Sequence, residues 1–525
     1  MPEPSPSLAA VGMTLDHASG VPLSRQIYQR IRAAILSGQL GPGLRLPSSR
    51  RLAAELGVSR TTTLAAYERL RDEGYLDGRV GAGTTVAFLT DLGATGRGTT
   101  GRGATGRGTT DVDAGRAGAR RSPATRRPRL SRQGAGLTGI RWRMPVAMAA
   151  PGSGPAAFPV GRPAFDAFPA ELWSKVVARR ARRSIGALLR YQHPAGYGPL
   201  REAIAAYVGM ARGVRCTPEQ VLVVSGAQAG LSLVARLLLD PGDPAWVEDP
   251  GYYGARGAIV AAGGVPSPAP VDADGLDVDA ARRRAPLARL AYVTPSHQFP
   301  LGVTMSLPRR LALLEWARTA DAYVVEDDYD SEYRYVGKPL PSLQGLDADG
   351  RVLYVGSFSK VLFPALRIGY VVVPEDLVEP FVTGHRFAAI HVPALEQAAL
   401  ADFIAAGHFA RHIRRMRALY AERGATLVDA IRRELGGLVS VAPARAGLHL
   451  IGWLAGGTAD EPAALRAAAH GVDTQPLSAH AIEPYGRPGL LLGYAATPAP
   501  DIVAGVRSLA AALNVTPSGG AVSSR

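Results

Sequence analysis

The sequence predicts an α/β protein with two parts, a small helix-rich unit followed by a larger body built around a mostly parallel β-sheet. In the first 90 residues, apolar side chains recur at helical spacing between glycine stops. From about residue 160, short runs rich in β-branched residues alternate with Ala- and Leu-rich helical patterns. That alternation is typical of a parallel sheet with helical connections. A Gly/Thr/Arg repeat separates the two patterns.

The composition limits the class of protein. With 525 residues, 47% of them hydrophobic, the chain can bury large cores. It has no run of about 18 apolar residues, and its N-terminus lacks the charged and apolar regions of a signal peptide. Cys216 is the only cysteine, which excludes an intrachain disulfide and a cysteine-based zinc site. We therefore expect a cytoplasmic protein without a membrane segment, and we predict no metal site.

The positive charge is concentrated near the N-terminus. The whole chain carries a net charge of +15. Residues 91–145 have 12 Arg against 3 Asp, a net charge of +9, and residues 1–90 contribute +3. The remaining body is nearly neutral for its size. A polyanionic partner is therefore expected to bind the N-terminal third of the chain.

Residues 94–110 read ATGRGTTGRGATGRGTT, a repeat of Gly, Thr and Arg. Without apolar periodicity such a segment buries too little surface to offset the entropy of ordering. We therefore predict a flexible linker over residues 91–143. Its arginines either contact DNA phosphates or belong to a solvated spacer. Residues 1–21 and 516–525 are also expected to be disordered.

Three helices are predicted between residues 22 and 90. The first carries apolar residues at every fourth position from Leu23 to Ile35 and ends at Gly38. The second begins at Ser48 or Ser49 and stops before Gly57.

The third helix follows Ser59, which suits an N-cap, and stops at Gly74. Two short extended runs around a glycine-rich turn come next, at residues 75–86. Helices joined by the turn Gly57-Val58 form a helix-turn-helix, and the extended pair forms a wing.

The second helix of a helix-turn-helix places its first residues against bases and phosphates. Here these residues combine an arginine, which can pair with guanine, and hydroxyls, which suit phosphate. Glycines at the wing tip would let it approach the minor groove. The predicted DNA-contacting residues are Arg45, Ser49, Arg50, Ser59, Arg60, Thr61, Thr62 and Gly83. The alternative is an ordinary helical bundle with capping residues. The run LPSSRRLAAELGVSRTT, within residues 22–88, resembles the winged-helix domain of the GntR regulators, and this resemblance implies DNA binding.

The segment GSFSKVLFPALRIGY, from Gly356 to Tyr370, sets Lys360 among apolar side chains, where the pKa of its ammonium group should fall. A partly neutral amine can attack an aldehyde. Ser357, Ser359 and Arg367 could hold a phosphate nearby. The simplest ligand with both an aldehyde and a phosphate is pyridoxal phosphate. The alternative is a surface lysine in a serine-rich turn.

Three more segments supply the other groups that pyridoxal phosphate requires. In VVEDDYDSEY, Asp327 suits the pyridine nitrogen and Tyr329 the phenolic oxygen, both on one side of an extended strand. SGAQAGLSLV opens a helix, so the amides of Ala227 and Gln228 form an anion site. EDPGYYGA offers Tyr252 as a ring that stacks on the cofactor.

In this order the segments resemble the fold-type I aminotransferases of class I, over roughly residues 160–515. The resemblance implies that fold for residues 144–515, with a smaller C-terminal α+β part. It also implies that Lys360 is the Schiff-base lysine and Asp327 the partner of the pyridinium. A homodimer is implied as well, because Tyr191 matches a tyrosine that reaches the neighbouring subunit's phosphate.

The chain departs from the aminotransferase pattern at two places. Their N-P-T-G turn is replaced by SHQFPLG, with Phe299 where the asparagine stands. His297 or Gln298 either compensates for that asparagine or fills the loop. The arginine that fixes the substrate carboxylate aligns with Leu491 in GLLLGYA, although Arg487 is close in sequence. Loss of a bidentate contact of this kind is expected to weaken amino-acid binding.

A GntR winged helix followed by an aminotransferase-like domain resembles the MocR subfamily of transcriptional regulators. The segments TPSHQFPLG and EDDYDSEYRY resemble that subfamily as well. The resemblance implies a homodimeric cytoplasmic regulator that senses pyridoxal phosphate, an amine or an amino acid through an aldimine at Lys360. The missing arginine favours pyridoxal phosphate itself as the signal, as in regulators of vitamin B6 synthesis. One alternative is a working aminotransferase localised by its N-terminal domain. Another is a DNA-binding protein with a cofactor-free body.

Overall fold

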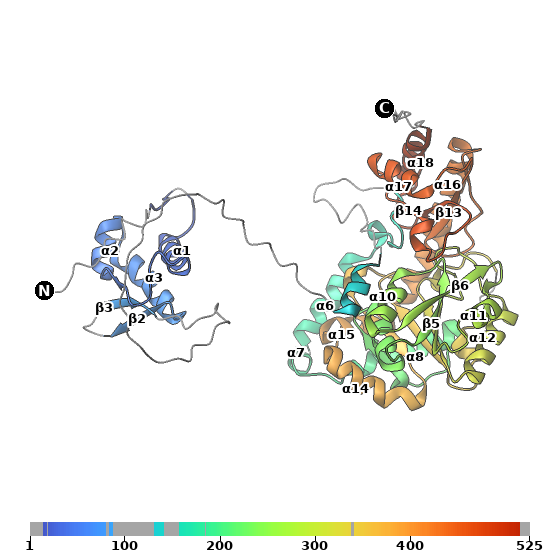
Figure 1. The fold of residues 1–525 in the computed structure, drawn as a ribbon, viewed down its shortest axis with the longest axis horizontal. Coiled ribbons are helices and arrows are strands. Elements are labelled where there is room, and N and C mark those ends of the chain that lie inside the picture. Colours follow the sequence, from blue (N-terminus) through green and yellow to red (C-terminus); the bar gives the residue numbers. More distant parts are fainter. Residues whose placement is uncertain are drawn as a thin grey trace, which may run out of the picture. The chain divides into compact units, whose positions relative to one another are not determined.

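The chain folds into two compact units with separate cores, residues 1–123 and 124–525 (Figure 1). The structure is a computed structural model. It describes residues 14–17, 19–79, 83–87, 131–140, 157–183, 185–337 and 341–514.

The first unit has the predicted winged helix-turn-helix. Its helices are α1 (Leu23–Leu36), α2 (Ser49–Leu56) and α3 (Arg60–Asp72). Its strands are β1 (Arg45–Leu46), β2 (Leu76–Arg79) and β3 (Gly83–Val86), in the antiparallel order β1-β3-β2. Strand β1 was not predicted, because a two-residue strand has no periodicity to detect.

Local sequence explains where α2 and α3 begin and end. The hydroxyls of Ser48 and Ser59 accept the backbone N–H groups of Arg51 and Thr62, as N-caps do. Gly57 ends α2 with a φ of 64°, a left-handed conformation that favours glycine. The predicted starts and stops of this pair are therefore confirmed.

The N-terminal segment differs from the predicted disorder where it meets α1. The side chain of Gln26, buried in α1, accepts from the backbone N–H of Asp16 at 2.9 Å. It donates to the backbone oxygens of Asp16 at 2.8 Å and Val21 at 2.9 Å. Leu15 packs against the core of the unit. The prediction of disorder up to residue 21 is therefore wrong here, because one buried amide satisfies several backbone groups that a composition argument does not consider.

The second unit is built on a mostly parallel sheet with the strand order β4-β11-β10-β9-β8-β5-β6-β7. Its central pairs are parallel, whereas β11 runs antiparallel to both β10 and β4. The strands are β4 (Val221–Val224), β5 (Pro244–Asp249), β6 (Val265–Asp272), β7 (Gly275–Leu276), β8 (Leu290–Val293), β9 (Tyr323–Asp328), β10 (Val352–Ser357) and β11 (Gly369–Val372). The predicted parallel sheet is confirmed.

A smaller antiparallel sheet, in the order β12-β13-β15-β14, forms the C-terminal part that the sequence predicted. Figure 1 shows this part, with α16, α17 and α18, gathered at one end of the unit. Its strands are β12 (Val439–Ser440), β13 (His449–Leu454), β14 (Gln475–Pro476) and β15 (Gly489–Gly493).

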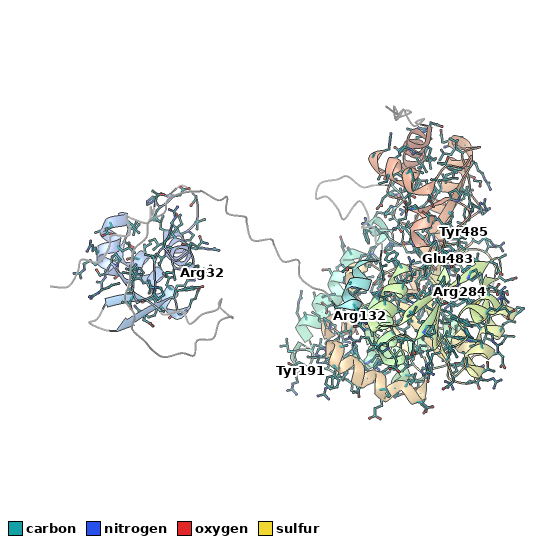
Figure 2. All side chains as sticks on the ribbon, viewed as in Figure 1. Arg32, Arg132, Tyr191, Arg284, Glu483 and Tyr485 are labelled. Carbon is teal, nitrogen blue, oxygen red and sulfur yellow. The ribbon has the colours of Figure 1, made fainter. Side chains whose placement is uncertain are left out.

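Helices cover both sheets of the second unit. They are α4 (Arg132–Thr138), α6 (Ala170–Arg183), α7 (Ile185–Leu188), α8 (Gly198–Arg212), α9 (Ala227–Leu238), α10 (Tyr253–Ala262), α11 (Val278–Arg284), α12 (Leu307–Thr319), α13 (Leu343–Leu346), α14 (Val378–Ala389), α15 (Ala394–Ala405), α16 (His408–Glu434), α17 (Asp460–Ala469) and α18 (Ala499–Asn514). The ion pair of Arg284 and Glu483 joins α11 to the C-terminal part (Figure 2).

Helix α4 corrects part of the predicted linker. The sequence predicted a flexible chain over residues 91–143, yet Arg132–Thr138 is helical. A Cβ on Gly136 would lie 3.2 Å from Val260, and one on Gly257 would lie 3.7 Å from Leu137. Helix α4 therefore packs closely on α10. Composition alone misses this, because the stabilising surface belongs to α10. Residues 91–130 and 141–143 lie outside the described residues.

Within the described part of the chain, no helix is both long and apolar enough to cross a membrane. The same residues contain no group of three or more His, Cys, Asp or Glu side chains that could hold a metal ion.

Candidate functional site

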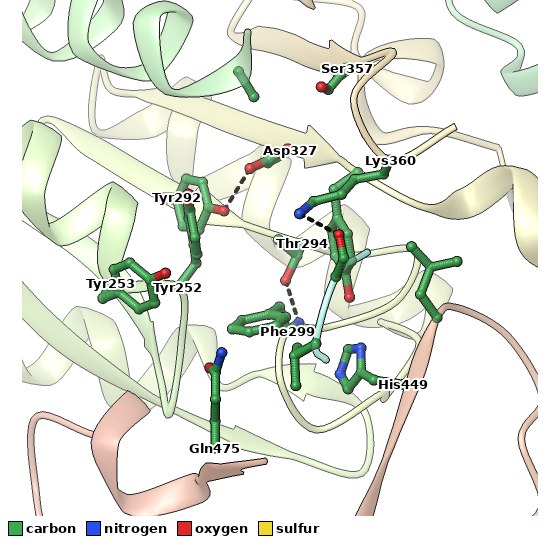
Figure 3. A pocket seen from close by; sticks show the side chains of 15 residues that line it. Tyr252, Tyr253, Tyr292, Thr294, Phe299, Asp327, Ser357, Lys360, His449 and Gln475 are labelled. Atoms are coloured by element: carbon green, nitrogen blue, oxygen red, sulfur yellow. Dashed lines mark hydrogen bonds between the residues drawn. The ribbon is translucent and has the colours of Figure 1, made fainter. Parts of the chain in front are cut away.

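A pocket in the second unit collects most of the side chains that the sequence predicted for a cofactor site (Figure 3). It lies where the carboxyl ends of β8, β9 and β10 face the first residues of β13 and β14. The lining residues are Val160, Gly161, Ala227, Tyr252, Tyr253, Tyr292, Thr294, Phe299, Asp327, Tyr329, Ser357, Lys360, Leu448, His449 and Gln475.

Lys360 points into this pocket, as Figure 3 shows. Its Nζ donates to the backbone oxygen of Gly161 at 2.9 Å. Burial lowers the pKa of Lys360, and the nearby acids Asp330 and Asp327 only partly oppose that effect. A Cβ on Gly161, whose φ is 71°, would lie 2.8 Å from Nζ. The left-handed φ favours glycine at position 161, where the backbone lies close to the Lys360 amine.

Asp327 lies at the end of β9 with one oxygen satisfied and the other not. Tyr292 donates to Oδ2 at 2.8 Å (Figure 3). Oδ1 is buried and has no hydrogen-bond partner among the described residues. Burial raises the pKa of Asp327 to about 7. A cationic ring N–H would supply both the missing donor and a counter-charge. Tyr292 was missed in the sequence, because LAYV has the pattern of an ordinary buried strand.

Arg367 lies beside the N-terminus of α9. Ala227 is the first residue of α9, where backbone N–H groups are free of intrahelical partners. The Arg367 Nη2 atom donates to the Ser225 backbone oxygen at 2.8 Å. A Cβ on Gly226, whose φ is 84°, would lie 3.1 Å from the Arg367 guanidinium carbon. The guanidinium therefore lies close to this helix end, and the left-handed φ favours glycine at position 226.

Ser357, Ser359 and Gln228 contribute in different ways. Ser357 lines the pocket and accepts the backbone N–H of Ser359 at 3.1 Å. The Ser359 hydroxyl oxygen is buried and has no partner in the described structure. The Gln228 side chain donates to the Gly254 oxygen at 2.8 Å and accepts from the Tyr252 hydroxyl at 3.3 Å. Gln228 therefore positions Tyr252 with its side chain, and only its backbone amide is available to an anion.

Tyr329 is held beside His297. The Tyr329 hydroxyl lies 3.0 Å from His297 Nδ1, and the same nitrogen lies 3.0 Å from Asp330 Oδ2. Gln298 instead braces its loop, donating to the Pro250 oxygen at 3.0 Å. Of the two candidates to replace the missing asparagine, His297 is the one in contact with Tyr329. The ring of Phe299 lies edge-on to the ring of Tyr329, with 6.0 Å between the ring centres.

Eight lining residues were not predicted from the sequence: Val160, Gly161, Tyr253, Tyr292, Thr294, Leu448, His449 and Gln475. His449 Nε2 lies 3.1 Å from the Pro300 backbone oxygen, and burial lowers the pKa of His449 to about 3. Gln475 Oε1 lies 3.0 Å from His480 Nε2. His449 and Gln475 come from the small sheet, and no local motif marks them.

Gln228, Ser359 and Arg367 are not among the lining residues, and neither are Leu491, Arg487 and Tyr191, which the sequence analysis also named. Leu491 is fully buried in β15, paired with Ile451 of β13 and Gln475 of β14. The Arg487 guanidinium lies 4.1 Å from the centre of the Trp453 ring. Tyr191 is 85% exposed (Figure 2), so it adds nothing to the pocket of its own chain.

The predicted DNA-contacting residues of α3 lie at the N-terminus of that helix, where Thr62 is half-buried. Arg60 and Thr61 are exposed, and Ser59 caps the helix. The Ser59 hydroxyl lies 2.7 Å from the hydroxyl oxygens of both Thr61 and Thr62. Hydroxyls and unpaired N–H groups therefore gather at the positive end of a helix dipole, which suits phosphate.

Arg45 and Gly83 meet across strands β1 and β3. A Cβ on Gly83 would lie 2.6 Å from Arg45 Nε, so the arginine side chain crosses the glycine. Arg50 is exposed at the start of α2. Ser49 has a structural contact, because its backbone oxygen accepts the Thr63 hydroxyl at 2.8 Å. Gly81 at the wing tip lies outside the described residues.

Two family models match the chain, one in each unit. Residues 23–86 match the family described as bacterial regulatory proteins, gntR family. Residues 160–470 match the family described as aminotransferase class I and II.

Several known regulators are similar over nearly the whole chain. The probable rhizopine catabolism regulatory protein MocR of Rhizobium meliloti is 41% identical over 97% of this chain and 97% of its own. The pyridoxine biosynthesis regulator PdxR of Corynebacterium glutamicum is 32% identical over 85% of this chain and 86% of its own.

Among solved structures, the α-aminoadipate aminotransferase LysN of Thermus thermophilus, in complex with N-(5'-phosphopyridoxyl)-L-leucine, matches with a TM-score of 0.66 and 31% identity. The match covers 72% of this chain and 96% of LysN. A gntR-family domain thus precedes an aminotransferase domain in this chain, which is similar to known regulators over most of its length. The chain therefore belongs to the MocR subfamily of gntR-family transcriptional regulators.

Proposed function

We propose that this regulator binds pyridoxal phosphate at Lys360 and that occupancy of the pocket changes its affinity for DNA. The protein would act in the cytoplasm as a homodimer joined through the aminotransferase-like unit. The winged helix would bind double-stranded promoter DNA with the N-terminus of α3 in the major groove.

The observation that carries the proposal is the buried Asp327 Oδ1, which lacks a partner among the described residues, in the same pocket as the Lys360 amine. Burying an unpaired carboxylate oxygen is costly unless a ligand completes it. A pyridinium N–H is such a ligand. The residues present fit the cofactor.

Each group of the cofactor has a candidate partner. Tyr252 would lie against the ring and Tyr329 beside the phenolic oxygen. The α9 amides of Ala227 and Gln228, the Ser357 and Ser359 hydroxyls and Arg367 would hold the phosphate. When bound, the cofactor would supply an aldehyde suited to reversible condensation with the Lys360 amine, with loss of one water. Burial lowers the pKa of Lys360 and so increases the neutral fraction of the amine.

Tyr191 supports the homodimer. Its ring is 85% exposed, and its nearest aromatic neighbour is His391 at 6.0 Å between ring centres. A large aromatic side chain at the surface, matching a tyrosine that reaches the neighbouring subunit's phosphate, fits a role in the site of a second copy.

The chain makes attachment simple to test, because it has three lysines, Lys175, Lys338 and Lys360. Full-length protein would be mixed with pyridoxal phosphate, reduced with borohydride and mapped by peptide mass. We expect the label on Lys360, loss of visible absorbance in Lys360→Ala, and no change in Lys175→Ala, whose side chain is exposed on α6. Equal DNA affinity of loaded and cofactor-free protein at fixed salt would refute the sensing role.

A second function, transamination, is favoured by the likeness to LysN. It requires a group that fixes the substrate carboxylate, and Leu491 stands at the position aligned with the aminotransferase arginine. Mixing the loaded protein with amino acids and a keto acid decides between the two functions. Multiple turnovers would establish an enzyme, whereas binding without turnover is expected of the regulator.

A further inference from the structure

We propose that Asp330 and His297 form a buried positioning pair that directs the proton of the Tyr329 hydroxyl toward the cofactor. The inference rests on the proposed function, because that proton would be donated to the phenolic oxygen of pyridoxal phosphate. It assigns a role to two side chains that do not line the pocket themselves but contact each other and Tyr329.

The pair is removed from water. His297 is 5% exposed and Asp330 is 1% exposed. His297 Nδ1 lies 3.0 Å from Asp330 Oδ2 and also 3.0 Å from the Tyr329 hydroxyl oxygen. One ring nitrogen therefore links a buried carboxyl group to a tyrosine that lines the pocket. Away from water, hydrogen bonds of this kind are strong and orient their partners firmly.

The carboxylate of Asp330 determines which nitrogen of His297 carries a proton. An ionised carboxylate has only acceptor atoms, so its hydrogen bond with Nδ1 requires a proton on Nδ1. This holds for the neutral imidazole and for the cationic one alike. A nitrogen that carries a proton cannot accept one from Tyr329. The N–H group instead faces two oxygens, one of Asp330 and the hydroxyl oxygen of Tyr329.

The Tyr329 hydroxyl therefore keeps its own proton to donate. Its oxygen is the acceptor in the contact with His297, and among the described residues the hydroxyl has no other hydrogen-bond partner. Because Tyr329 lines the pocket, the O–H group is available to a molecule inside it. The phenolic oxygen of the cofactor is an acceptor that suits this donor.

The residues that follow His297 in the chain cannot supply that hydrogen bond. Phe299 stands where the aminotransferases have an asparagine, and its ring has no N–H or O–H group. The Gln298 Nε2 atom donates to the backbone oxygens of Pro250 at 3.0 Å and of Phe299 at 2.7 Å. The direction of the Tyr329 proton therefore decides whether the phenolic oxygen receives a hydrogen bond from this side.

Two glycines hold the imidazole in place. A Cβ on Gly447, whose φ is 82°, would lie 2.5 Å from His297 Nδ1 and 2.8 Å from Asp330 Oδ2. A Cβ on Gly302 would lie 3.2 Å from His297 Nε2. The backbone of Gly447 is itself fixed, since its oxygen accepts the Tyr494 hydroxyl at 2.8 Å. The ring is therefore packed between two backbone segments, which limits its rotation.

The charge of Asp330 also acts on the amine of the site. Burial lowers the pKa of Lys360, and the charge of Asp330 opposes this effect more than that of Asp327 does. Arg162 and Arg367 lower the same pKa by their charge. A variant at position 330 therefore changes the amine as well as the tyrosine. Ligands that differ only at the phenolic oxygen separate the two effects, because the effect on the amine is common to both ligands.

Pyridoxal phosphate and 3-deoxypyridoxal phosphate, which lacks the phenolic oxygen, are such ligands. Equilibrium dialysis with the full-length protein gives both dissociation constants, and their ratio measures the preference for the phenolic oxygen. We expect Tyr329→Phe to lower this preference by about three- to tenfold. His297→Ala should lower it similarly, because the freed carboxylate of Asp330 then competes for the tyrosine proton.

The double variant tests whether His297 acts through Tyr329. His297→Ala combined with Tyr329→Phe should lower the preference no further than Tyr329→Phe alone. Additive losses, or an unchanged preference in His297→Ala, would overturn the proposal.

His385→Ala is the matched control. His385 is also buried, and its Nδ1 atom lies 2.7 Å from the backbone oxygen of Pro194, outside the pocket. The control should keep the preference of the unmodified protein, and a similar fall in both histidine variants would overturn the proposal. If His297→Ala does not melt cooperatively, Asp330→Leu takes its place. Nδ1 could then accept the Tyr329 proton, so the preference should fall, and an unchanged preference would refute the role of the carboxylate.

The readouts separate this inference from the proposed function. If the unmodified protein binds neither compound, the cofactor proposal itself fails. If it binds both compounds and every variant keeps its preference, only the role of the pair is wrong.

Discussion

Tyr292 donates its hydroxyl to one oxygen of Asp327 at 2.8 Å, and the other oxygen is buried without a partner among the described residues. The carboxyl is thus oriented by the protein but left incomplete. Burial raises its pKa from 3.8 to about 7. Two predictions about stability and cofactor binding follow from that one contact.

Asp327→Asn should stabilise the cofactor-free protein at pH 8 and abolish cofactor binding. Because the folded pKa of Asp327 is raised above its unfolded value of 3.8, the stability that it contributes is present below about pH 4 and lost as the pH rises through about 7. Asparagine removes this loss, which is about 4 kcal/mol for a pKa raised from 3.8 to about 7. Thermal or chemical denaturation at pH 5 and pH 8 measures it.

The comparison needs both pH values, because burial also raises the pKa of Glu248 to about 7. Some pH dependence therefore remains in the variant. A variant that is no more stable than the unmodified protein at pH 8 would contradict the account of Asp327. Glu248→Gln serves as a control, since it should change the pH dependence without removing the partner of the ring nitrogen.

Gly226→Ala should weaken the binding of pyridoxal phosphate by more than a general loss of protein stability would. The new Cβ would stand 3.1 Å from the Arg367 guanidinium carbon, and the φ of 84° strains any L side chain. Gly437→Ala is the matched control, because its φ is 87° and nothing lies within 4 Å of its Cβ. Equilibrium dialysis with pyridoxal phosphate and with pyridoxal measures the effect. We expect Gly226→Ala to affect only the phosphorylated form, and equal losses for both forms would exclude a phosphate role.

Arg60→Ala should reduce DNA affinity by about 1–3 kcal/mol if the side chain reads a base. It is the first residue of α3 and is exposed. Arg51→Ala is the control, because Arg51 on α2 is also exposed but pairs with Glu55 at 2.9 Å. Fluorescence anisotropy over a salt series, with duplexes from the region upstream of the gene, gives affinity and salt slope together. Equal losses for the two variants would argue against a specific role for the α3 terminus.

Tyr191→Ala should impair a site in the other subunit. Mixed dimers of Tyr191→Ala and Lys360→Ala chains would contain one site with both residues intact and one with neither. We expect cofactor binding to recover to about one quarter of a site per chain in an equal mixture, since random exchange also restores parental pairs and each mixed dimer has one intact site. Absorbance of the mixture compared with the separate variants measures this. No recovery after subunit exchange would place Tyr191 outside the partner's site.

The cofactor half of the pocket was largely predictable, because its residues lie in short segments with their own chemistry. Lys360, Asp327 and Ala227 each follow or end a strand whose pattern is visible in the sequence. Parallel strands bring such ends to one edge of the sheet. Tyr292 was not predictable in this way, because nothing in LAYV distinguishes a tyrosine that donates to a carboxylate from one that fills a core.

The pocket residues that come from the small sheet could not be found by local reasoning. His449 and Gln475 begin short strands, and their position depends on how the small sheet packs against the large one. The sequence indicated that Leu491 stands where the aminotransferases have an arginine. Its burial with Ile451 and Leu477 is a property of the folded sheet. Helix α4 was missed for a similar reason, since a glycine-rich heptamer has little helical tendency until a surface receives it.

Helix α10 joins two places that the sequence kept far apart. Tyr252 and Tyr253, at its first turn, line the pocket. Val260 and Gly263, at its other end, meet Gly136 and Gln133 of α4. A ten-residue helix is about 15 Å long and behaves as a short rigid rod. The segment that leads from the DNA-binding unit is thus anchored to the far end of the rod whose near end forms a wall of the pocket.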